Sequence, residues 1–122
     1  MKNDRALASG LVLAALACLS GPGARAEDDE DAAAKGRAMA EAKCARCHAI
    51  GLDDKSAHAA APPFRVVIER YPSEYLAEAL AEGIVSGHPD MPVFVLEPAE
   101  IDAFLAYLEG LREAQKSPPR AE

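Results

Sequence analysis

Apolar residues recur at helical spacing toward the end of this chain of 122 residues. Between Pro98 and Glu113 they fall at positions i, i+3, i+4, i+7 and i+10, which are Ile101, Phe104, Leu105, Leu108 and Leu111. This spacing gathers them on one face of a helix, which would pack against a core while the intervening acidic residues face water. Because proline is favoured in the first turn of a helix, we expect this helix to begin at Pro98 and to end near Glu113.

Two shorter helices are predicted in the middle of the chain. The first would start at Pro63, end before Pro72, and bury a face made of Phe64, Val67, Ile68 and Tyr71. The second would have Ser73 as its N-cap, end at Gly83, and bury a face made of Tyr75, Leu76, Ala79 and Leu80.

An alanine-rich helix is predicted over residues 32–44, with Asp31 as its N-cap. Gly36 interrupts it. A glycine inside a helix costs about 1 kcal/mol relative to alanine, so its presence indicates a packing requirement. Turn-forming residues predict loops at residues 51–61 and 86–92, and the sequence contains no strand pattern. The chain is therefore expected to be all-α, with about four helices in one domain.

The start of the chain has the pattern of an export signal. Lys2 and Arg5 precede an apolar stretch at residues 11–19, which is too short to span a bilayer. An A-x-A cleavage site follows at residues 24–26. We therefore expect residues 1–26 to be a signal peptide and the mature protein to be periplasmic.

Cys18 offers the alternative of a lipid anchor. The residues before it match a lipoprotein cleavage box poorly, because Ala15 stands where such a box usually has leucine. Cleavage after Ala26 would leave Cys44 and Cys47 as the cysteines of the mature chain.

Acidic residues dominate the charge. The formal net charge is −7, and removal of residues 1–26, which carry three basic residues and one acidic residue, would make it −9. This charge argues against nucleic acid as a partner and favours proteins with basic patches. We expect residues 27–31 to be an acidic disordered lead-in, residues 32–114 to form the domain, and residues 115–122 to be a flexible tail.

Two cysteines and a histidine stand together in Cys44-Ala45-Arg46-Cys47-His48. The C-x-x-C-H pattern is typical of covalent haem attachment, since two thiols on one turn can reach the two vinyl groups on one edge of a haem. His48 would then lie beneath the ring, where its imidazole can bind the iron. The pattern predicts one haem c bound through Cys44 and Cys47.

Two other uses of a C-x-x-C pair stay open. A zinc site needs two more ligands, for which the chain offers Cys18, His58 and His88 without a second C-x-x-C or an H-x-x-x-H. A redox dithiol of the thioredoxin type is usually found in a β-α-β unit, and no strand pattern lies near Cys44.

Met91 stands between two prolines in the predicted loop at residues 86–92, so its backbone freedom is limited. A thioether presented on a stiffened loop is a candidate sixth ligand for the iron, although methionine also serves to fill gaps in a core. His58 is expected to be a solvated loop residue and His88 a loop residue near the rim of the haem, with iron ligation as the alternative for each.

Over about residues 31–114 the chain resembles the class I cytochrome c family. The resemblance is carried by the C-x-x-C-H motif near the start of the domain, by Gly36 eight residues before Cys44, and by the aromatic-bearing segment Phe104-Leu105-Ala106-Tyr107-Leu108. It implies a fold of about four helices around one haem. It also implies that Gly36 lets the first helix cross closely against the last.

The same resemblance extends to the ligands. Met91-Pro92 resembles the loop that supplies the sixth ligand, so the resemblance implies His48 and Met91 as the axial pair. In this family a proline carbonyl accepts a hydrogen bond from the ligating histidine. The resemblance implies Pro62 for this role, with Pro63 as the other candidate.

These features predict a monomeric, single-haem electron carrier of the periplasm that exchanges electrons with other proteins and is not an enzyme. The alternative is an enzyme or gas-binding haem protein with an open distal position, for which His88 is the nearby acid–base candidate. A zinc-binding module is the third possibility.

Overall fold

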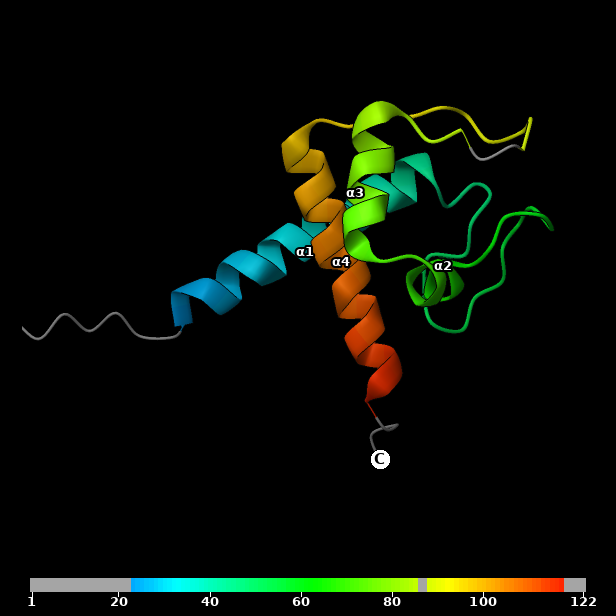
Figure 1. Cartoon of the computed structure of the whole chain (residues 1–122). Coiled ribbons are helices and arrows are strands. Elements are labelled where there is room, and N and C mark those ends of the chain that lie inside the picture. The colour runs from blue at the N-terminus through cyan, green and yellow to red at the C-terminus, as the bar shows by residue number, and fades with distance from the viewer. Residues whose placement is uncertain (1–22, 86–87, 118–122) are drawn as a thin grey trace, which may run out of the picture.

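Four helices make up the computed structural model, which describes residues 23–85 and 88–117. They are α1 (Gly23–Lys43), α2 (Phe64–Arg70), α3 (Ser73–Glu82) and α4 (Pro98–Lys116). The long helices α1 and α4 cross each other, and α2, α3 and the connecting loops gather to one side of the crossing (Figure 1). No strand occurs in these two ranges, which confirms the all-α prediction. None of their helices is long and apolar enough to cross a membrane.

The crossing of α1 and α4 depends on Gly36. A Cβ atom at this position would lie 1.9 Å from the carbonyl oxygen of Ala103 in α4, so only glycine permits the approach. Ala40, one turn further along α1, is fully buried in the core. At the end of α1, the ammonium group of Lys43 lies 2.9 Å from the carboxylate of Glu100 in the first turn of α4. The packing reason predicted for Gly36 is thus the crossing.

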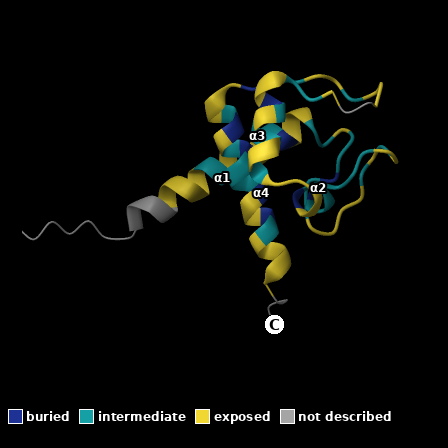
Figure 2. Ribbon diagram, in the orientation of Figure 1, coloured by how far each residue is buried: buried dark blue, intermediate teal, exposed yellow. Residues whose placement is uncertain are grey.

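α1 begins earlier than predicted, and two expectations are wrong there. Residues 27–31 are helical rather than a disordered lead-in, and Asp31 lies inside the helix rather than capping it. Alanines follow this acidic run, and Asp31 pairs with Lys35 one turn later at 2.6 Å, which favours continuation of the helix. This part of α1 is exposed and extends away from the other helices (Figure 2). Most of the expected signal peptide, residues 1–22, lies outside the described residues.

The other helix ends mostly agree with their sequence signals. Gly83 has φ of +97° at the C-cap of α3, a conformation that favours glycine. Pro72, not Ser73, occupies the N-cap position of α3, and Ser73 is its first helical residue. α4 begins at Pro98 as expected, but it continues to Lys116, beyond both Glu113 and the expected start of the flexible tail at residue 115.

The predicted stripe of α4 forms the centre of the core, where Ile101, Phe104, Leu108 and Leu111 are all buried. Phe64 and Ile68 of α2 and Leu80 of α3 pack against it. Two tyrosines depart from their predicted inward faces: Tyr71 is 52% exposed and Tyr75 is 66% exposed. Both line the cavity described next, so they face a hollow rather than packed side chains.

Candidate functional site

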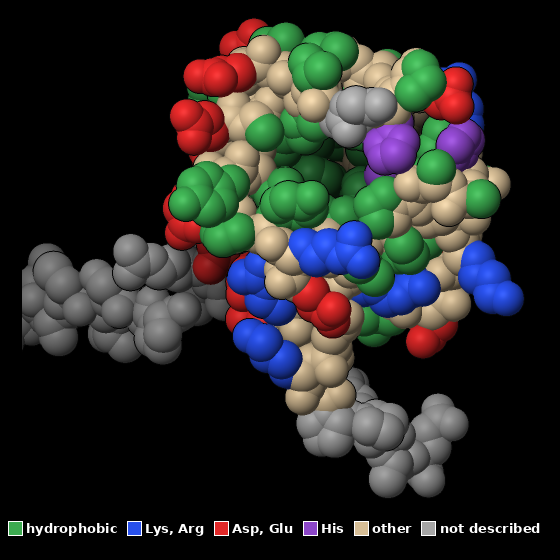
Figure 3. All heavy atoms as spheres, turned by 45° about the vertical axis from the view of Figure 1, so that its right-hand side comes forward, with side chains coloured by type: hydrophobic (Ala, Val, Ile, Leu, Met, Phe, Trp, Pro, Cys, Tyr) green, Lys and Arg blue, Asp and Glu red, His purple; other side chains and the backbone are tan. Residues whose placement is uncertain are grey.

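A cavity of about 900 Å³ lies among the helices and the two long loops. Figure 3 shows it as a hollow with mainly hydrophobic walls, and side chains from all four helices contribute to those walls. Phe104 and Leu108 come from α4, Leu76 and Leu80 from α3, and Val67 from α2. Cofactor sites usually measure about 300–1,000 Å³ and are mostly apolar with a few polar groups, so the cavity suits a large, mostly apolar cofactor.

The C-x-x-C-H motif lies at the wall of this cavity, directly after α1. The backbone N–H groups of Cys47 and His48 donate to the Cys44 carbonyl oxygen at 3.0 and 2.9 Å, which folds the motif into one turn. Cys44, Cys47 and His48 all line the cavity, and both thiols are free and partly buried. The turn therefore brings two thiols and one imidazole to the same space, as the motif predicts.

Burial raises the pKa of the Cys44 thiol, and the charge of Lys43 offsets only a part of this rise. The thiol is therefore neutral at neutral pH. Thioredoxin-type dithiols depend on a lowered thiol pKa, so the environment of Cys44 argues against that interpretation of the pair.

Zinc is also poorly supported. Within residues 23–85 and 88–117, no group of three or more histidine, cysteine, aspartate or glutamate side chains comes together as a metal would require. Residues 1–22, which include Cys18, lie outside this search.

The His48 imidazole is oriented by two neighbours. Its Nδ1 atom lies 2.7 Å from the carbonyl oxygen of Pro62, and its ring centroid lies 5.3 Å from that of Phe64. A carbonyl oxygen only accepts hydrogen bonds, so Nδ1 carries the proton and the lone pair of the neutral ring is on Nε2. The carbonyl of Pro63 instead accepts bonds from the backbone of α2. The carbonyl that contacts His48 is therefore that of Pro62.

Met91 lines the same cavity from the loop between α3 and α4, although it is far from His48 in the sequence. Its backbone N–H donates to the carbonyl of His88 at 3.2 Å, which tightens the loop. His58 also reaches this loop, with Nε2 lying 3.3 Å from the Asp90 carboxylate. His58 is thus a half-exposed residue that connects two loops rather than a freely solvated one.

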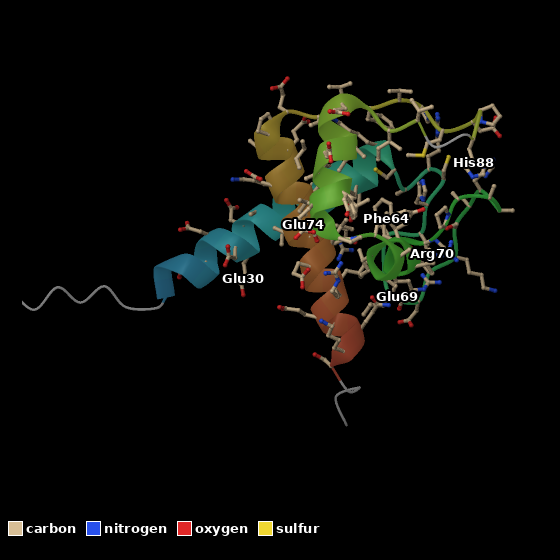
Figure 4. The ribbon with its side chains drawn as sticks, viewed as in Figure 1. Glu30, Phe64, Glu69, Arg70, Glu74 and His88 are labelled. Atoms are coloured by element: carbon tan, nitrogen blue, oxygen red, sulfur yellow. The ribbon has the colours of Figure 1, made fainter. Side chains whose placement is uncertain are left out.

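The structure adds residues to the site that sequence reasoning missed. Met39 of α1 brings a second thioether to the cavity, and Arg46 and Arg70 bring two guanidinium groups. His88, which the sequence already offered as a candidate near the haem, lines the cavity as well and is labelled in Figure 4. Helical periodicity could have placed Met39 on the buried side of α1, but no pattern in the sequence indicates which loop side chains share a cavity.

The donor set fits a covalently attached haem. Two thiols, an imidazole with its lone pair on Nε2 and a thioether all line one apolar cavity. Haem c uses thiols for attachment, and nitrogen and sulfur ligands suit its iron.

Comparisons with known proteins agree with this geometry. Residues 33–112 match the family described as Cytochrome c. Among curated proteins, cytochrome c-552 of Bradyrhizobium diazoefficiens is 34% identical over 80 residues, which is 66% of this chain and 75% of that protein. No solved structure matches the chain. The chain therefore belongs to the cytochrome c family of electron-transfer haem proteins, and its haem c is bound covalently through the C-x-x-C pair Cys44 and Cys47.

Proposed function

We propose that this protein is a periplasmic carrier of single electrons whose haem iron has His48 and Met91 as axial ligands. The observation that carries the proposal is that both side chains line the cavity that also holds the two cysteines. The haem supplies an iron that accepts and releases one electron. The chain supplies the ligands and an apolar enclosure. The signal-like N-terminus supports the periplasmic location.

Each ligand has a separate role. The Pro62 carbonyl accepts a hydrogen bond from the Nδ1–H group of His48, which makes Nε2 a stronger electron-pair donor and fixes the plane of the ring. The Met91 thioether stabilises the reduced iron and raises the reduction potential. With both axial positions taken, no position is left for a substrate, and this supports a carrier rather than an enzyme.

A second candidate for the sixth ligand is His88, because it also lines the cavity. A bis-histidine site would have a lower potential than a histidine–methionine site. An open distal position with His88 as an acid–base group would instead support peroxidase-like or gas-binding activity.

Spectroscopy of the purified holoprotein separates these candidates. We expect a low-spin spectrum, a pyridine haemochrome of one haem per chain with two thioether bonds, and a near-infrared magnetic circular dichroism band typical of histidine–methionine ligation. We expect no carbon monoxide binding at neutral pH. A band typical of bis-histidine ligation would favour His88, and rapid binding of carbon monoxide or cyanide would favour an open site.

We propose further that the redox partners are proteins with basic patches and that the carrier is a monomer. The formal charge of −7 for the full chain, which becomes −9 on removal of residues 1–26, supports the choice of partner. On α3, Glu74, Glu78 and Glu82 are all exposed at intervals of four residues, on the helix that brings Tyr75 to the cavity. A basic partner attracted to these carboxylates would come close to the cavity.

Charge steering can be measured with small redox probes. Reduction of the cation tris(phenanthroline)cobalt(III) by the protein should slow as salt rises, and reduction of the anion hexacyanoferrate(III) should accelerate. Replacing Glu74, Glu78 and Glu82 with glutamine should weaken the salt dependence with the cation by about twofold. The matched control replaces Asp28 and Asp29 with asparagine and Glu30 with glutamine on the projecting part of α1. Equal effects of the two triple variants would contradict a steering role for α3.

A further inference from the structure

Asp54 binds the backbone just after the proposed ligand His48. Its two carboxylate oxygens accept hydrogen bonds from the N–H groups of Ile50 at 3.0 Å and Gly51 at 2.9 Å. The Arg65 guanidinium holds the residue in place by donating to the Asp54 carbonyl at 2.8 Å. A Cβ atom at Gly51 would lie 3.0 Å from the carboxylate, so glycine leaves room for this contact. One charged side chain thus satisfies two consecutive backbone donors in a segment without regular secondary structure.

Tyr107 holds the same segment from the other side. Tyr107 lies in α4, and its hydroxyl donates a hydrogen bond to the Ile50 carbonyl oxygen in the loop. Burial raises the pKa of Tyr107, with a smaller opposing effect from Arg37, so the hydroxyl stays protonated and remains a donor. The side chains of Asp54 and Tyr107 therefore hold residues 50 and 51 through charge-assisted and neutral hydrogen bonds.

The remaining backbone groups of residues 49–51 are bonded as well. The N–H of Ala49 donates to the Ser56 hydroxyl at 3.0 Å, and its carbonyl accepts from the N–H of Phe64 at 2.9 Å. The Gly51 carbonyl accepts from Arg65 at 3.5 Å. All six polar backbone groups of this segment thus have partners, which is a high degree of constraint for a loop.

The constrained segment directly follows His48, which carries the imidazole. The Ala49–Phe64 bond and the His48–Pro62 bond are neighbouring links between the same two segments, residues 48–49 and 62–64. A shift of residues 49–51 would therefore change the distance between the His48 Nδ1 atom and the Pro62 oxygen. That distance controls how much electron density the imidazole gives to a metal on Nε2.

We propose that Asp54 and Tyr107 are positioning residues that keep the His48 imidazole on the Pro62 carbonyl and thereby lower the reduction potential of the haem. The proposal rests on His48 being an iron ligand, as proposed above. A strong bond to Pro62 makes the imidazole more basic and favours the oxidised iron, so loosening the bond raises the potential.

The test compares Asp54→Ala with Asp53→Ala in the holoprotein. Asp53 is the neighbouring aspartate; both residues are exposed, and both changes remove one negative charge, which itself raises the potential. Tyr107→Phe removes the hydroxyl without changing charge. At a fixed potential, we expect the ratio of reduced to oxidised protein to be at least twofold higher in Asp54→Ala than in Asp53→Ala. A twofold ratio corresponds to a difference in reduction potential of about 18 mV, since a tenfold ratio corresponds to 59 mV. We expect Tyr107→Phe to raise the potential relative to the wild type.

Hydrogen exchange gives a second measurement. A loss of overall stability would speed exchange throughout the protein, whereas the proposal predicts faster exchange at His48 alone. In the reduced protein, the His48 Nδ1 proton should exchange at least about tenfold faster in Asp54→Ala and Tyr107→Phe than in Asp53→Ala, while amide protons of the α1–α4 crossing stay protected. Equal potentials and equal His48 exchange rates in all variants would overturn the proposal and leave His48 ligation intact. Failure of His48 ligation would be evident earlier, in the spectrum of the wild type.

Discussion

Replacement of Met91 with alanine is expected to lower the reduction potential by on the order of 0.1 V or more, because axial ligands set haem potentials over a range of about 0.8 V. The thioether that stabilises the reduced iron would be lost, and the sixth position would open. The variant should therefore also bind carbon monoxide at neutral pH, which the wild type should not. Potentiometric titration and an optical spectrum under carbon monoxide measure both effects.

Met39 provides a matched control, because it is the same residue type and lines the same cavity from α1. Met39→Ala should change the reduction potential only slightly and should not permit carbon monoxide binding. The assignment of Met91 would be wrong if its variant kept the wild-type potential and spectrum. If Met39→Ala instead lowered the reduction potential, Met39 of α1 would be the sixth ligand of the iron.

Replacement of Gly36 with alanine is expected to destabilise the holoprotein by about 3 kcal/mol, at the upper end of the usual cost of overpacking. The added Cβ would lie 1.9 Å from the Ala103 carbonyl oxygen and 2.9 Å from the Tyr107 Cβ. Neither atom can move aside by rotating a flexible side chain, so the crossing of α1 and α4 must open. Unfolding in guanidinium chloride, followed by circular dichroism, measures the loss of free energy.

Gly110→Ala is the control for this prediction. Gly110 also lies inside a helix, but a Cβ atom there would have no atom within 4 Å. The change should therefore stabilise α4 by up to about 1 kcal/mol, through helix propensity alone. A loss of unfolding free energy in Gly36→Ala together with a gain in Gly110→Ala would show that the packing around each glycine decides the effect of its replacement. A loss of less than about 0.5 kcal/mol for Gly36→Ala would contradict a tight crossing.

The features that could be predicted from sequence are those that depend on neighbours along the chain. Periodicity identified the buried face of α4, Gly83 marked the end of α3, and Gly36 indicated a close contact. The C-x-x-C-H spacing indicated the cofactor, because attachment requires only that two thiols and one imidazole share a single turn. Helical start signals were less reliable: the acidic run at residues 27–31 reads as disordered, yet it continues into alanines and is helical.

Contacts between distant segments were decided by the tertiary structure. Pro62 and Pro63 are equivalent in sequence, and only the approach of residues 48–49 to residues 62–64 selects the Pro62 carbonyl. The same holds for the exposure of Tyr71 and Tyr75, which follows from the cavity beside them. Short-range patterns determine which residues form helices and which residue types can bind a haem. The hydrogen-bond partner of a loop carbonyl or imidazole depends instead on how the helices pack, and short-range sequence patterns do not determine that packing.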